Sequence, residues 1–154
     1  MQQCLKNSIG TIVQPNLVFI NNSFLKTLPV EHYQNGLAEV YKIALINNKT
    51  FWNSLQIGKL TELELIKKAI TLKQNIVNKD PFEKGLRKIL NFGHTIGHAI
   101  ESLSLQKDKN SLLHGEAIRI GMLCEAYLSH KTAGLSKKQF NEIIQYLIAE
   151  DRKS

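Results

Sequence analysis

Residues 91–101 read NFGHTIGHAIE and hold the densest group of chemically active side chains in this 154-residue sequence. His94 and His98 are four residues apart, just over one helical turn, so a helix here projects both imidazoles from one face. Gly93 and Gly97 repeat that spacing, although each glycine costs a helix about 1 kcal/mol relative to alanine. We therefore expect another backbone or a ligand to approach this helix closely.

A third histidine stands at the start of the next apolar segment, which predicts a helix over residues 114–132. If that helix folds back antiparallel, His114 comes near His94. Two histidines, a carboxylate and an open position would form a catalytic zinc site. Spacing alone leaves a solvated pair of histidines equally open, because no glutamate follows the first histidine as in HExxH. The sequence offers three acidic residues as the carboxylate: Glu39, Glu101 and Glu116.

Cationic residues form a second group of candidates. Glu39 and Lys42 share a helix face, and this pattern alone favours a surface ion pair worth about 0.2–0.5 kcal/mol. However, Glu39 lies in an otherwise apolar run, where a solvated carboxylate is not expected. Arg87 and Asn91 are also one turn apart, and together with Lys73 they would form an anion pocket beside a metal. Taken singly, each cation is more often on a solvated face.

The composition limits the class of protein. A chain of this length that is 43% hydrophobic, with 20 Lys and Arg against 13 Asp and Glu, builds one core and favours anionic partners. Two cysteines outside any CxxC argue against a disulfide scaffold and for a reducing compartment, the cytoplasm. We expect no membrane partner, because no apolar run approaches the roughly 20 residues of a membrane span. We expect no nucleic acid either, because no basic stripe carries interleaved aromatics.

The pattern of apolar residues predicts a mainly α fold with one short strand. The strand is expected over residues 16–21, which are rich in β-branched and aromatic side chains. A lone strand needs a partner, either a second copy or a sheet outside this chain. Helices are expected over residues 30–47, 62–78, 92–104, 114–132 and 137–149, with shorter ones from Thr50 through Trp52 and from Asp80 to about Leu90. Asn35-Gly36 would divide the first helix, and Thr61 and Glu64 would form a capping box at the start of the helix over 62–78. A loop is expected at 105–110.

Taken together, these segments resemble the 3-dehydroquinate synthase family. The resemblance rests on GLAEVYK at residues 36–42, on residues 85–101, on LHGEA at 113–117, and on KNSIG at 6–10 and LKTLP at 25–29. It implies the multi-helix C-terminal domain of that fold. Residues 26–154 would form the metal- and substrate-binding domain, incomplete at its C-terminus. Residues 1–25, including the strand, would be the remnant of an NAD-binding α/β domain.

The resemblance also implies an activity. The family converts 3-deoxy-D-arabino-heptulosonate 7-phosphate, an anionic sugar phosphate, to 3-dehydroquinate and phosphate in the shikimate pathway of aromatic amino acid biosynthesis. The steps are oxidation by NAD, phosphate elimination, reduction and an intramolecular aldol closure. A divalent metal is implied, zinc first and cobalt second, with NAD as the second cofactor. The full-length enzyme would be a cytoplasmic homodimer.

Residue roles follow from the resemblance, position by position. The metal ligands would be Glu39, His94 and His114. The catalytic residues would be His98, which would contact substrate and support proton transfer, with Lys42 and Arg87. The substrate-binding residues would be Asn7, Lys42, Lys73, Arg87, Asn91 and His98. Lys6 would serve cofactor binding, and Glu83 would orient Arg87.

Departures from the family leave alternatives open. Family members are about twice as long, and this sequence lacks their glycine-rich NAD-binding turn and a late phosphate-binding lysine. We therefore expect no NAD binding and no turnover from this chain alone. Another sugar-phosphate cyclase of the same superfamily is the first alternative, which Lys73, Arg87 and Asn91 together disfavour. A polyol dehydrogenase ranks lower. The last alternative is a non-catalytic helical interaction fragment, which would not require a bound metal.

Overall fold

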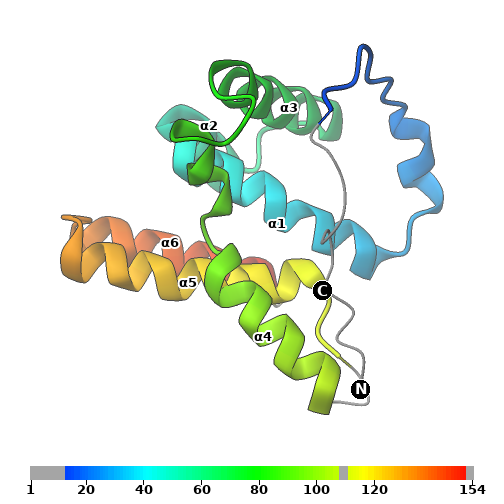
Figure 1. The fold of residues 1–154 in the computed structure, drawn as a ribbon. Coiled ribbons are helices and arrows are strands. Elements are labelled where there is room, and N and C mark those ends of the chain that lie inside the picture. Colours follow the sequence, from blue (N-terminus) through cyan, green and yellow to red (C-terminus); the bar gives the residue numbers. More distant parts are fainter. Residues whose placement is uncertain (1–12, 108–110, 152–154) are drawn as a thin grey trace.

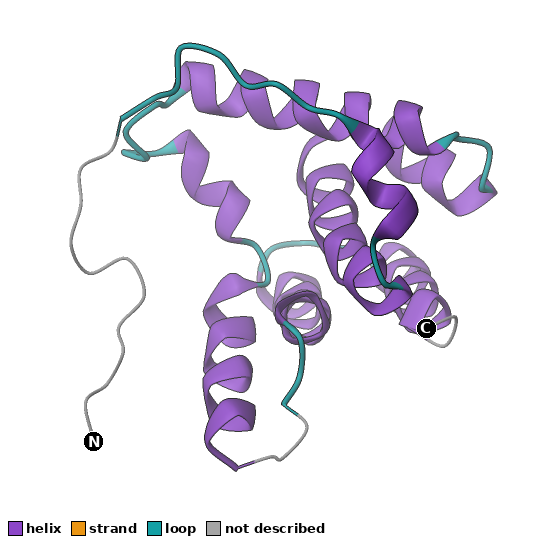
Figure 2. Cartoon of the chain, turned by 90° about the vertical axis from the view of Figure 1, so that its right-hand side faces the viewer, coloured by secondary structure: helices purple, strands orange, loops and turns teal. Residues whose placement is uncertain are grey.

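The computed structural model describes residues 13–107 and 111–151, and within these ranges it contains helices and no strand (Figures 1 and 2). The mainly α prediction is confirmed. The α-helices are α1 (Val30–Asn47), α2 (Lys49–Ile57), α3 (Glu62–Lys79), α4 (His94–Lys107), α5 (His114–Thr132) and α6 (Lys137–Asp151). Two 3-10 helices are η1 (Asn22–Thr27) and η2 (Leu86–Asn91). None of these helices in the described part of the chain is long and apolar enough to cross a membrane.

Local capping signals placed the start of α3 correctly. The Thr61 backbone N–H donates to Glu64 Oε2 at 2.8 Å, and the Glu64 N–H donates back to Thr61 Oγ1 at 3.4 Å. This capping box satisfies two backbone donors that the first turn of a helix leaves unpaired. The predicted helix starts at 62, 114 and 137 agree with α3, α5 and α6, and Ser136 and Gln139 form the same reciprocal pair at the start of α6.

Three element boundaries differ from the sequence prediction. Asn35-Gly36 does not divide α1, because the Asn35 side chain accepts a hydrogen bond from Gly115 N of α5 instead of forming a turn. Residues 80–85 form a turn rather than a helix, because the Asp80 carboxylate accepts the backbone N–H groups that a helix would use. The loop expected at 105–110 begins later, since α4 continues to Lys107.

The predicted strand over residues 16–21 is wrong. This segment runs alongside α3 with no strand pairing, and its side chains are open to solvent, Leu17 by 83% and Phe19 by 86%. A strand needs a neighbouring strand to accept its backbone hydrogen bonds, and the described residues provide none. β-branched composition was therefore not sufficient to form the element.

The core is built around α5, which contacts α1, α4 and α6. In Figure 1, α6 lies antiparallel beside α5, and α4 crosses α5 from the other side. Ile118, Met122 and Leu147 are fully buried at this centre. Tyr146 packs edge-on against Tyr41 and Trp52, with ring centroids 5.5 and 4.9 Å apart, and so joins α6 to α1 and α2.

Glycines bring α4 and α5 unusually close. Gly93 precedes α4 with a φ of 80°, a left-handed conformation that favours glycine. A Cβ at Gly97 would lie 2.8 Å from Ile118 Cδ1 and 3.0 Å from the Ala117 carbonyl oxygen of α5. A Cβ at Gly121 would overlap the Gly93 carbonyl oxygen. The expected close approach is confirmed, and the neighbour is another backbone.

Candidate metal centre

Three histidines from α4 and α5 meet where these helices pack. His94 and His98 lie one turn apart on α4, and His114 is the first residue of α5. One ring nitrogen from each lies within 4.8 Å of the others, and the ring centroids are 5.1 to 5.7 Å apart. The prediction that His114 comes near His94 is confirmed. Imidazole is a preferred ligand of zinc, cobalt and other divalent metals.

Hydrogen bonds to the Nδ1 atoms of His94 and His114 decide which ring nitrogen carries the hydrogen. His94 Nδ1 lies 3.2 Å from the Phe92 carbonyl oxygen, and His114 Nδ1 lies 3.1 Å from Glu101 Oε2. Both oxygens can only accept, so each Nδ1 carries the hydrogen and donates it. Each neutral ring therefore carries its lone pair on Nε2, which is how metal-binding histidines are usually held.

Of the three candidate carboxylates, Glu39 is the one with a buried oxygen that has no hydrogen-bond partner. Glu116 Oε2 accepts the backbone N–H of Leu113 at 2.7 Å and so caps α5. Glu101 Oε2 accepts a hydrogen bond from His114 Nδ1. Glu39 Oε1 is buried without a hydrogen-bond partner, 3.4 Å from His94 Nε2. Two lone pairs facing each other at that distance favour a cation between them, so this donor set fits a divalent metal.

Lys42 occupies the other side of Glu39. Its ammonium donates to Glu39 Oε2 at 2.7 Å and lies 3.5 Å from His94 Nε2. Because Lys42 is only 3% exposed, the simple surface ion pair that the spacing favoured is wrong. A buried ammonium fixed beside His94 is a ready donor for an oxygen-rich anion.

The protonation states of these groups suit metal binding. Burial by itself would raise the pKa of Glu39, but the hydrogen bond and charge of Lys42, helped by His94 and Lys73, hold that pKa below its usual value. Burial and the charge of Lys42 lower the pKa of His94. Burial also lowers the pKa of Lys42, against the opposing effect of Glu39. Near neutral pH the site therefore offers an ionised carboxylate and a neutral imidazole, the forms that bind metals.

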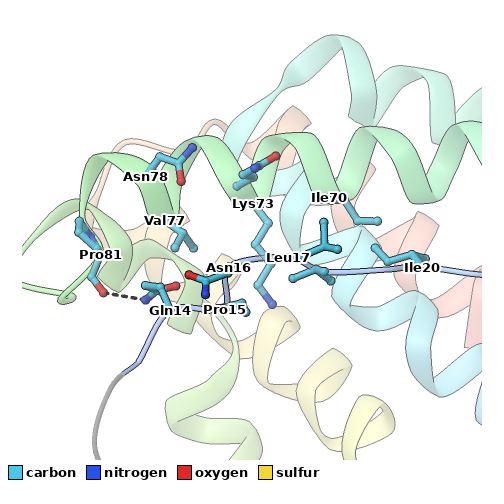
Figure 3. A pocket seen from close by; sticks show the side chains of 12 residues that line it. Gln14, Pro15, Asn16, Leu17, Ile20, Ile70, Lys73, Val77, Asn78 and Pro81 are labelled. Atoms are coloured by element: carbon cyan, nitrogen blue, oxygen red, sulfur yellow. Dashed lines mark hydrogen bonds between the residues drawn. The ribbon is translucent and has the colours of Figure 1, made fainter.

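Lys73 lines a cavity of about 860 Å³ between α3 and the extended segment at residues 14–20 (Figure 3). Its side chain extends from α3 past Asn16 and Leu17, and its charge makes a small contribution that lowers the pKa of Glu39 and that of Lys42. Gln14 Nε2 donates to the Pro81 carbonyl oxygen at 3.4 Å across one end of this cavity. Lys73 is therefore an exposed cation whose charge acts on Glu39 and Lys42.

Arg87 and Asn91 lie on η2, immediately before α4. Arg87 Nη1 donates to the Pro81 carbonyl oxygen at 2.7 Å. Asn91 Nδ2 donates to Glu83 Oε1 at 2.6 Å. The prediction that Glu83 orients Arg87 is wrong, because Glu83 holds Asn91 instead. Neither Arg87 nor Asn91 hydrogen-bonds the three histidines in the described residues, and the predicted Asn7 and Lys6 lie outside those residues.

The carboxylate of Asp80 anchors the turn before η2. It accepts backbone N–H groups from Lys84 at 2.9 Å, Gly85 at 2.8 Å and Arg87 at 3.0 Å. These three hydrogen bonds, from Arg87, Gly85 and Lys84, lower the pKa of Asp80. Asp80 therefore fixes the backbone from which the Arg87 side chain extends.

An Asp80→Asn substitution should show this role as a pH-dependent loss of stability. A carboxylate whose pKa is lower in the folded protein than in the unfolded chain stabilises the fold at any pH above its unfolded pKa of about 3.8. This stabilisation is lost as the pH falls through the folded-state pKa. The variant should therefore be less stable than the wild type at neutral pH, and the difference should shrink as the pH falls below about 3.8. Urea unfolding followed by the fluorescence of the single, buried Trp52 measures this difference. A difference that stays constant over this pH range would contradict the assignment.

The sequence analysis named Glu101, Asp80 and Asn35 but missed the roles that they have at the site. Glu101 lies seven residues after His94 and three after His98, and that helical spacing already placed it on the same face. Asp80 begins an Asp-Pro turn, which is a common use of aspartate as an acceptor for nearby backbone N–H groups. Asn35, which accepts from Gly115 N at the start of α5, had no local signal, because its partner is 80 residues away.

The comparisons with known proteins agree with this geometry. The family model described as "3-dehydroquinate synthase C-terminal" matches residues 36–151. A 3-dehydroquinate synthase of Parabacteroides distasonis is 38% identical over 149 residues, which is 93% of this chain and 42% of that protein. One of Thermodesulfovibrio yellowstonii is 45% identical over 146 residues, 90% of this chain and 40% of that protein. The chain thus spans about two fifths of the length of these curated relatives.

Proposed function

This chain belongs to the 3-dehydroquinate synthase family, and from that membership we propose that it provides the metal- and substrate-binding part of a 3-dehydroquinate synthase. The reaction would convert 3-deoxy-D-arabino-heptulosonate 7-phosphate to 3-dehydroquinate and phosphate. One observation carries the proposal. Glu39 Oε1 lies 3.4 Å from His94 Nε2, and a ring nitrogen of His114 lies within 4.8 Å of one of His94, so residues from three helices gather inside the segment that matches the family.

We infer that Glu39, His94 and His114 hold the metal, with zinc as the first candidate and cobalt as the second. The orphaned Glu39 Oε1 and the Nε2 lone pairs of the two histidines support this set. When bound, the metal would draw electron density from substrate hydroxyl groups and make one of them easier to deprotonate. NAD, bound mainly by the rest of the enzyme, would accept a hydride and return it.

The cations of this chain would bind the substrate's phosphate, carboxylate and hydroxyl groups. Lys42 is fixed by its 2.7 Å hydrogen bond to Glu39 and would donate to an oxygen placed beside His94. Lys73 would add positive charge from α3, and Arg87 offers the planar fork that pairs with carboxylates. Asn91, held by Glu83, would complete this set. Burying such a dianion without these partners would be costly.

His98 is proposed as the residue that holds or moves a proton. It lies one turn after His94 on the same face, its ring centroid is 5.1 Å from that of His94, and it is exposed. A histidine beside a metal but outside its ligand set can accept or donate a proton near neutral pH.

Organisation beyond this chain stays a prediction. Residues 26–154 would form the helical domain, and residues 1–25 would join it to the NAD-binding part. We also predict a cytoplasmic homodimer for the full-length enzyme. No observation favours the sister cyclases over the dehydroquinate branch.

A fusion protein tests the proposed activity. The part of the Thermodesulfovibrio yellowstonii relative that precedes the matched region would be joined to this chain, and phosphate release from 3-deoxy-D-arabino-heptulosonate 7-phosphate would be measured. We expect release that requires both zinc and NAD+. The matched control is the same fusion with His114→Ala, which should release none.

Two outcomes would overturn the proposal. Release only from a sugar phosphate that lacks the carboxylate would assign the chain to a sister cyclase. A folded, zinc-loaded fusion that releases no phosphate, beside an active intact relative, would leave this chain without the proposed chemistry.

A further inference from the structure

We propose that Glu101 is a positioning residue that fixes the tautomer of His114 and thereby prepares its Nε2 atom to bind a metal. This inference adds a positioning residue to the metal site of the proposed function, and it rests on that function only for the identity of the metal. The tautomer itself can be measured in the metal-free chain.

The placement of Glu101 follows from the helical repeat of α4. His94, His98 and Glu101 occupy positions i, i+4 and i+7, which lie along one face of a helix. That face meets the start of α5, so Glu101 Oε2 reaches His114 Nδ1 across the helix interface at 3.1 Å. Both side chains are partly buried, with exposed fractions of 25% and 35%.

The chemistry of the pair allows one hydrogen arrangement. An ionised carboxylate only accepts hydrogen bonds, so His114 Nδ1 must carry the hydrogen. The neutral ring then has its lone pair on Nε2, on the side away from Glu101. Without such an acceptor, a neutral histidine in water prefers the opposite tautomer, with the hydrogen on Nε2. That tautomer would present an N–H to the site in place of a lone pair, and would have to rearrange before a metal could bind.

Glu101 has no competing role among the described residues. Its recorded hydrogen bond and ion pair are both with His114. Of the other acidic residues considered for the site, Glu116 caps α5 through Leu113 N, and Glu39 is paired with Lys42. The carboxylate of Glu101 is therefore committed to one ring nitrogen.

His94 provides an internal control. Its Nδ1 donates to the backbone carbonyl oxygen of Phe92, which no side-chain substitution removes. A change at Glu101 should therefore alter the tautomer of His114 and leave that of His94 unchanged. General loosening of the fold would disturb both rings, so the two histidines separate positioning from structural damage.

The test combines NMR with zinc titration of the 154-residue chain. Long-range proton–nitrogen spectra of the metal-free, nitrogen-15-labelled chain at about pH 8, where imidazoles are neutral, report each tautomer. We expect the Nδ1–H form at His94 and His114 in the wild type. Glu101→Leu should convert His114 alone to the Nε2–H form and weaken zinc binding about 10- to 100-fold.

Glu101→Gln is the conservative variant, because its amide oxygen still accepts from Nδ1. It should keep the His114 tautomer and recover most of the zinc affinity. An unchanged His114 tautomer in Glu101→Leu would overturn the inference, and so would equal disturbance of His94 and His114 in both variants. A selective tautomer change in Glu101→Leu, together with a wild-type chain that binds no zinc, would support the positioning role while contradicting the metal site of the proposed function.

Discussion

Gly121→Ala should destabilise the protein by about 3 kcal/mol or more, because α4 and α5 pack there with no space for a methyl group. An added Cβ would overlap the carbonyl oxygen of Gly93 and lie 2.8 Å from the backbone nitrogen of Gly97. Both obstacles are backbone atoms, which cannot rotate away as a flexible side chain can. The loss is a large part of the 5–15 kcal/mol that stabilises a typical domain.

The matched control is Gly36→Ala. Gly36 also lies inside an α-helix, but a Cβ there would meet nothing within 4 Å. Alanine should therefore stabilise α1 by up to about 1 kcal/mol through its better helix propensity. Denaturant unfolding followed by Trp52 fluorescence measures both variants. Similar unfolding free energies for the two alanine variants would show that the α4–α5 contact is looser than the structure indicates.

His94→Ala should reduce zinc retention from about one ion per chain to none, whereas His98→Ala should retain it. His94 has its Nε2 beside the free Glu39 oxygen and its Nδ1 fixed by Phe92. His98 shares the same helix face but is exposed, and the proposed function assigns it to proton transfer. The two variants remove the same side chain one turn apart, so they separate ligation from the mere loss of an imidazole.

Zinc would be counted after equilibration with limiting metal and desalting, in protein purified without a histidine tag. Glu39→Gln completes the series, because it removes the carboxylate charge while preserving side-chain size, and it should weaken zinc retention. Loss of zinc in His98→Ala with full retention in Glu39→Gln would assign the metal to the three histidines instead. Retention in all three variants would place the metal elsewhere.

Helical periodicity and capping residues predicted most of the fold. Thr61 and Glu64 marked the start of α3 because both partners of the capping box lie within four residues. The strand at 16–21 failed for the opposite reason, since a strand depends on a neighbour that its own residues do not specify. The helix expected after Asp80 failed because one carboxylate captured the backbone donors of three later residues.

The sequence likewise predicted only part of the candidate site. Spacing placed His94 and His98 on one face, and the sequence offered His114 and three carboxylates, among which the family resemblance selected Glu39. The sequence did not show that Lys42 is buried, nor that Glu101 serves His114 rather than the metal. Both facts depend on which helix faces lie against each other.

The sequence by itself determined the helices, their caps and the shared face of the two histidines on α4, because these depend on residues at most one or two turns apart. Only the tertiary structure decided that the carbonyl oxygen of Gly93 packs in the space that a side chain at Gly121 would fill. It also decided that His114 and Glu39 lie beside His94. These contacts join residues far apart in the chain. Their distances are set by how closely α1, α4 and α5 can pack, which no local pattern specifies.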